Sequence, residues 1–111
     1  MATVEKILGQ KATAATTEWD LYTVGASTST VVTCIMVCNR GTTSTTFRIS
    51  TAPAGAATAP DQYQYYDYVI EGGISIPLSN IRWTLATTDK IRVYAGNANL
   101  SFTAYGSERA V

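Results

Sequence analysis

Apolar and polar residues alternate in short stretches along most of the chain, and turn-forming residues separate one stretch from the next. Alternation with a period of two is typical of strands that bury one face, and clusters of Gly, Pro, Asn and Ser indicate turns. No long window has convincing helical periodicity. The stretches that predict strands are residues 17–24, 30–38, 45–51, 62–70, 74–78, 80–85, 91–95 and 100–106.

About eight short strands at this regular spacing predict an all-β fold, a single β-sandwich or jelly-roll-like domain of antiparallel strands. We assign this domain to residues 13–111. Residues 1–12, which contain Val4, Ile7 and Leu8, are expected to form an N-terminal arm or a first edge strand. The last five residues are expected to form a tail.

The strand predicted at residues 30–38 is apolar on both of its faces. One face is expected to carry Val31, Ile35 and Val37, and the other Val32, Cys34, Met36 and Cys38. A strand that is apolar on both faces is covered on both faces. One face is therefore expected to meet the sandwich core, and the other an arm, a loop or a partner subunit.

The two cysteines of the chain, Cys34 and Cys38, lie four residues apart in this strand. At about 3.3 Å per residue they would be roughly 13 Å apart, too far for a disulfide with each other. We expect buried free thiols that pack as small hydrophobic groups, with intermolecular crosslinks in an assembly as the alternative.

Four of the seven tyrosines fall within residues 62–68. Strict alternation places Tyr63 and Tyr65 on one face and Tyr66 and Tyr68 on the other. Three interpretations stay open: packing in and over the sheet, a protein interface, and sugar binding by exposed rings. The residues predicted to contact a protein partner are Val4, Ile7, Leu8, Tyr63, Tyr65, Tyr66 and Tyr68.

Composition favours a protein whose surface is covered by other proteins. The 111 residues are 46% hydrophobic and 14% charged, and the formal net charge is zero. A sparsely charged, neutral surface suits protein assemblies better than nucleic acid, which requires a basic patch. We expect no nucleic-acid partner and, without an apolar run of eighteen residues or a signal-peptide pattern, no membrane partner.

Candidate chemistry is sparse. The chain has no histidine, and its many Ser and Thr residues have no visible base to activate them. Glu18 and Asp20 share a strand face and are interpreted as a solvated pair. The remaining acids do not form a calcium-loop pattern, and no glycine-rich phosphate loop is present. We expect no enzyme activity, cofactor or metal.

Several segments resemble a family of short virion structural proteins from tailed bacteriophages and their prophages. The matching segments are ILGQ, DLYTV, VVTCIMVCNRGTTSTTFRIS, PAGAA, YYDY and LATTDKIRVYAGNANLSFTAYGSE, which together cover nearly the whole chain. One departure is Gly25, where similar chains usually have Pro. The resemblance implies a structural protein and carries no catalytic residues.

Two assembly roles fit this resemblance. The first is a capsid decoration or cement protein that binds across major capsid protein subunits and stabilises the shell. The second is a neck, tail or fibre-associated component. A third role, from a different class, is a carbohydrate-binding module for host attachment that uses Tyr66 and Tyr68. The expected partners are the major capsid protein or other virion proteins and further copies of the chain. The expected location is the virion, assembled in the host cytoplasm.

Overall fold

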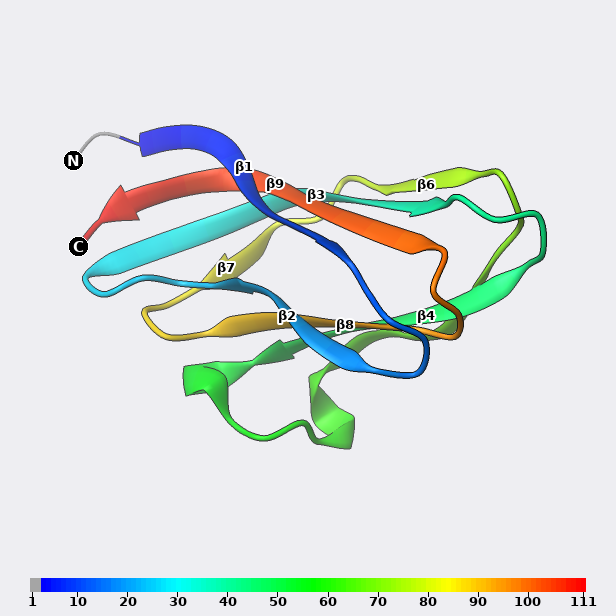
Figure 1. Cartoon of the computed structure of the whole chain (residues 1–111). Coiled ribbons are helices and arrows are strands. Elements are labelled where there is room, and N and C mark those ends of the chain that lie inside the picture. Colours follow the sequence, from blue (N-terminus) through cyan, green and yellow to red (C-terminus); the bar gives the residue numbers. More distant parts are fainter. Residues whose placement is uncertain (1–2) are drawn as a thin grey trace.

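Two antiparallel β-sheets pack face to face in the computed structural model, which describes residues 3–111 (Figure 1). The five-stranded sheet has the order β1 (Thr3–Ala12), β9 (Leu100–Ala110), β3 (Thr28–Asn39) and β6 (Ser75–Leu78), and β7 (Trp83–Leu85) also pairs with β3. The four-stranded sheet has the order β2 (Glu18–Thr23), β8 (Lys90–Ala95), β4 (Thr45–Ala52) and β5 (Tyr63–Ile70). The predicted all-β sandwich is confirmed.

The strands pair in a nested order. β4 pairs with β5, β3 with β6 and β7, β2 with β8, and β1 with β9, so each pair encloses the previous one along the sequence. Because this nested ribbon is folded into two facing sheets, the arrangement is that of a jelly roll. β6 and β7 pair with opposite ends of β3, so they occupy one strand position, and eight positions result from nine strands.

The core lies between the two sheets and comes from the inward positions of both. β8 and the first half of β9 keep the predicted alternation of buried and more exposed residues. β4 keeps it as far as Ile49, after which a register shift against β5 buries the neighbouring Ser50 as well. The rings of Phe47 in β4 and Phe102 in β9 meet edge to face, with centroids 6.2 Å apart. Both side chains are fully buried, so they join the two sheets at the centre of the sandwich.

β3 carries a bulge that changes which residues face the core. Its pairing with β9 shifts register between Val32 and Cys34. Val32, rather than Val31, is therefore buried together with Ile35 and Val37. The predicted face of Val31 is wrong, because a bulge inserts one extra residue and reverses the alternation beyond it.

Three further differences from the predicted strands have local causes. β2 shifts register between Asp20 and Tyr22, so the neighbours Leu21 and Tyr22 are both buried. The expected C-terminal tail is wrong for residues 107–110, which continue β9 between β1 and β3. Residues 3–12 form an edge strand on β9, while the first two residues of the predicted arm lie outside the described part of the chain.

Candidate functional site

The outer face of the five-stranded sheet, the side turned away from the four-stranded sheet, carries a row of large uncharged side chains. Ile7 of β1 lies opposite Tyr105 of β9, and Tyr105 lies opposite Cys34 of β3. Directly opposed residues share a face, so the three side chains form one cross-strand row. Met36, two residues further along β3, lies on the same face opposite Thr103.

This row remains accessible to a partner. Ile7 is 51% exposed and Tyr105 is 38% exposed. Cys34 and Met36 are half-buried by their neighbours in the sheet. The strands of residues 3–111 form two sheets and no third sheet lies over this face, so the second apolar face of β3 is left partly open. Both cysteines are free, as predicted, but they are half-buried on this outer side rather than buried.

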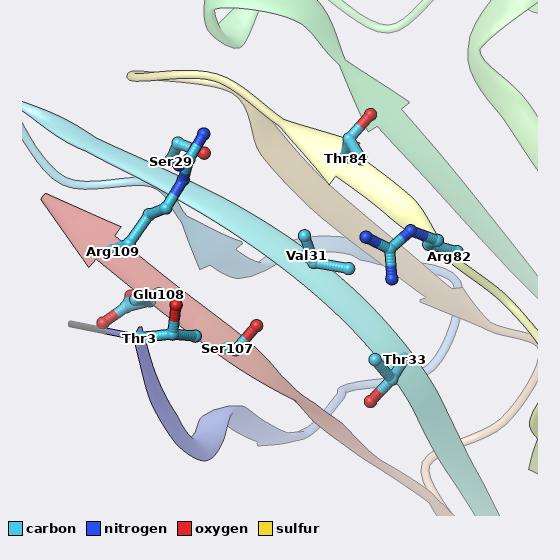
Figure 2. Close-up of a pocket in the computed structure, with 9 residues that line it drawn as sticks. All are labelled: Thr3, Ser29, Val31, Thr33, Arg82, Thr84, Ser107, Glu108 and Arg109. Carbon is cyan, nitrogen blue, oxygen red and sulfur yellow. The ribbon is translucent and has the colours of Figure 1, made fainter. Parts of the chain in front are cut away.

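A hollow of about 580 Å³ opens on the same sheet, beside the row (Figure 2). It lies over β3 and is bordered by β9 and β7. Its lining is made of small hydroxyl side chains, one valine, two arginines and one glutamate. The lining residues are Thr3, Ser29, Val31, Thr33, Arg82, Thr84, Ser107, Glu108 and Arg109.

The glutamate of the hollow, Glu108, is engaged by groups at the end of the sandwich. Its carboxylate accepts hydrogen bonds from the Tyr22 hydroxyl and from Nζ of Lys6, the latter at 3.0 Å. The Tyr22 oxygen lies 2.8 Å from Oγ1 of Thr30, which donates to it because the Tyr22 proton goes to Glu108. Tyr22 belongs to the four-stranded sheet, so this network connects the two sheets.

The same contacts set the protonation states of the network. The Tyr22 hydroxyl, followed by Lys6, holds the pKa of Glu108 below its ordinary value. Burial, followed by the hydrogen bond to Glu108, raises the pKa of Tyr22 to about 12. Both shifts favour a charged carboxylate beside a neutral phenol, so the two partners agree.

Glu108 is expected to contribute to the acid sensitivity of the fold. A carboxyl whose pKa is lower in the folded state stabilises the protein above its unfolded pKa, and this stabilisation is lost as pH falls through the folded pKa. The free energy of unfolding should fall between about pH 7 and about pH 3, and this fall should be smaller in Glu108→Gln than in the unmodified protein. Urea titration at each pH measures it. Asp20, whose pKa is lowered mainly by Lys90, should keep part of the acid sensitivity.

Glu5→Gln is the matched control for this experiment, because Glu5 is an exposed carboxyl on β1. The free energy of unfolding of this variant should fall with pH as it does in the unmodified protein. If Glu108→Gln and Glu5→Gln have the same pH profile, the proposed contribution of the Tyr22–Glu108–Lys6 network is wrong.

The tyrosines of β5 pair differently from the predicted alternation. Asp67 has a positive φ of 50°, and the pairing of β4 with β5 shifts register between Phe47 and Ile49. Tyr65 and Tyr68 consequently lie beside each other at a centroid distance of 5.6 Å, and both contact the buried ring of Phe47. Tyr63 and Tyr66 form the other pair, 4.9 Å apart.

Tyr66 belongs to a rigid cluster on the outer side of the four-stranded sheet. The Arg48 guanidinium lies 4.3 Å from the ring centre of Tyr66 and 4.5 Å from that of Tyr94. Nε of Arg48 also donates to Asp67 at 2.7 Å, and this contact raises the pKa of Arg48. A shallow groove of about 430 Å³ lies beside this cluster and is lined by Thr58, Ala59, Pro60, Tyr63 and Tyr66.

The seven residues predicted to contact a partner are divided among separate surfaces. Val4 and Ile7 are exposed on β1, whereas Leu8 packs against the core. The other members all lie on β5, where Tyr66 and Tyr68 are exposed but point to different sides of the strand, and Tyr63 and Tyr65 are half-buried. The prediction that Tyr66 and Tyr68 share one face is therefore wrong.

The pattern along the chain did not identify Arg82 or Arg109 as site residues. Arg82 precedes β7, and Arg109 lies in the segment that was expected to be a tail. They line one hollow only because β3 pairs with both β7 and β9. Tyr105 was likewise missed, since its only sequence signal is an outward position in an alternating strand.

Comparison with known proteins identifies no relative: no family model, no curated protein and no solved structure matches the chain. In residues 3–111 no three His, Cys, Asp or Glu side chains come together as a metal site. Nor does that part of the chain contain a helix long and apolar enough to cross a membrane.

Proposed function

We propose that the chain is a structural protein of a tailed bacteriophage virion, a capsid decoration or cement protein that binds across major capsid protein subunits. The observation that carries this proposal is the uncovered row of Ile7, Tyr105 and Cys34, continued by Met36, on the outer face of the five-stranded sheet. The resemblance of the sequence to short virion proteins supports the same role. Further copies of the chain are expected to take part in the assembly.

The composition of this row suits a protein interface. Aromatic residues and methionine are enriched where proteins meet, and charged residues are depleted at the centre of such contacts. The row lies on three adjacent strands whose other side packs on the core, so it is a rigid surface. Because these strands are already ordered, this chain loses little conformational entropy when a partner binds there, which favours a stable complex.

Two alternative roles lead to different expectations. A neck, tail or fibre-associated component could use the same face, but it would be present in about a dozen copies per particle, whereas a shell protein would be present in hundreds. Sugar binding would use the groove beside Tyr63 and Tyr66, not the predicted pair of Tyr66 and Tyr68. A glycan array and the copy number in purified particles distinguish these roles from a shell protein.

Removing the row should weaken binding to the shell. The test is co-sedimentation of the protein with empty shells made of the major capsid protein encoded in the same genome. Ile7→Ser combined with Tyr105→Ser should lower the affinity by about tenfold to a hundredfold, because two exposed apolar contacts of about 1 kcal/mol or more are lost. Circular dichroism checks that the fold is retained.

Val69→Ser combined with Tyr66→Ser is the matched control. Val69 is a β-branched aliphatic residue like Ile7, and Tyr66 is a tyrosine like Tyr105. They are at least as exposed, at 56% and 59%, but they belong to β5 of the other sheet. The control should bind shells as the unmodified protein does. Failure of the unmodified protein to bind shells, or equal binding by the Ile7/Tyr105 variant, would contradict the proposal.

A further inference from the structure

The five arginines of the chain fall into two groups by their contacts. Nε of Arg48 and Nε of Arg92 lie 2.7 and 3.1 Å from carboxylate oxygens, and Arg40 donates to a backbone carbonyl at 3.0 Å. Within residues 3–111 the side chains of Arg82 and Arg109 make no hydrogen bond or ion pair. These two are also the arginines that line the hollow on the five-stranded sheet.

The two guanidinium groups reach over the hollow from different segments, Arg109 from β9 and Arg82 from the loop before β7. In Figure 2 the side chain of Arg109 extends from β9 toward Ser29, and the side chain of Arg82 extends toward Val31 from the β7 side. The hydroxyls of Ser29, Thr84 and Ser107 lie around the same space. Val31 forms an apolar patch between the two cations.

The hollow is electropositive because its one carboxylate is already neutralised. Both carboxylate oxygens of Glu108 are bound, one by Nζ of Lys6 and the other by the Tyr22 hydroxyl, and neither is bound by an arginine. Arginine is weakly hydrated and presents a planar fork of donors that matches a carboxylate. Two such groups beside hydroxyl donors form a receptor for negative charge.

We propose that this hollow binds the carboxylate side chains of an acidic peptide segment on a partner protein. Two cations that approach from opposite sides of Val31 suit two carboxylates separated along a chain better than one compact anion. Val31 can pack against the methylene groups of a glutamate. The hollow adjoins the row of Ile7 and Tyr105, so the inference depends on the proposed function for its partner, while the site itself can be tested alone.

The test is a titration of the full-length, isotopically labelled protein followed by NMR. The probe is a capped hexapeptide of alternating alanine and acidic residues, and the reference probe has Gln and Asn in place of Glu and Asp. The acidic probe should shift the amide signals of Ser29, Val31 and Ser107, and the reference probe should not. Arg82→Gln and Arg109→Gln should each lower the affinity at least about tenfold, because each removes a charge-assisted contact.

Arg40→Gln is the matched control, since it removes the same charge from an exposed arginine that does not line the hollow. It should leave the affinity for the acidic probe unchanged. The inference is overturned if both probes bind equally, if all three arginine variants bind equally, or if inorganic phosphate at the same concentration displaces the acidic probe completely.

Shell binding separates this inference from the proposed function. Suppose that shells bind the unmodified protein, that the Arg82→Gln/Arg109→Gln double variant binds them with the same affinity, and that this affinity does not change with salt. The acidic-peptide site is then wrong and the structural role stands. If the acidic probe binds but shells do not, the site stands and the structural role is wrong.

Discussion

Phe47→Ala is expected to lower the free energy of unfolding by about 3–5 kcal/mol, the usual range for truncating a buried aromatic residue. The ring of Phe47 has no exposed surface and contacts Phe102 across the sandwich and Tyr65 and Tyr68 on the next strand. Truncation leaves a cavity between the two sheets and removes favourable aromatic contacts at the same time. Urea unfolding followed by tryptophan fluorescence measures the loss.

Tyr66→Ala is the control for Phe47→Ala, because it truncates an aromatic residue on the neighbouring strand that is 59% exposed. Its effect should stay at about 1 kcal/mol, since only the surface contacts of its ring with Arg48 and Tyr63 are lost. Equal losses in the two variants would mean that Phe47 is not the centre of the core.

Gly106→Ala is expected to destabilise the protein by at least about 3 kcal/mol, at the upper end of the range for overpacking. A Cβ at this position would overlap the backbone carbonyl of Val31 on β3 and lie 3.0 Å from Cδ1 of Leu8. The carbonyl belongs to the central strand of the five-stranded sheet and cannot move without disturbing its pairing with β9. Thermal and urea unfolding measure the effect.

Gly25→Ala is the control for Gly106→Ala. The nearest atom to a Cβ at Gly25 is Oγ1 of Thr28 at 3.7 Å, an ordinary contact, so the change should stay within about 0.5 kcal/mol. A loss for Gly106→Ala no larger than that of the control would show that β9 can move away from β3 at this point.

The alternation of apolar and polar residues was sufficient to predict the fold class and most strand positions, because burial of one face has a period of two. It failed where the period is broken. The bulges at Thr33 in β3 and at Asp67 in β5 change which face the residues beyond them occupy. Neither threonine nor aspartate in a strand predicts a bulge by itself. The bulge in β3 caused the wrong face for Val31. The tyrosine pairs were misassigned because β5 shifts register against β4 twice, between Phe47 and Ile49 and between Ile49 and Ser50.

The candidate site was less predictable than the fold, since it depends on which strands become neighbours. A second apolar side of β3 was expected from its sequence alone, with an arm, a loop or a partner subunit as its cover. The hollow beside it needs Arg82 and Arg109, which are 27 positions apart in the printed sequence, to reach the same strand. The local pattern of apolar and polar residues does not show that β3 pairs with both β7 and β9, because this pairing is a property of the jelly-roll topology.

The nested pairing of the strands has a consequence for how the chain is made. Among the strands of residues 3–111, β1 is synthesised before the others, but the strand with which it pairs, β9, is synthesised after all of them. At about 5–20 residues per second, β1 waits roughly 5–20 seconds before it can pair. Throughout translation its Val4 and Ile7 remain available to chaperones and to neighbouring nascent chains, so the yield of folded protein depends on what protects the first strand during synthesis.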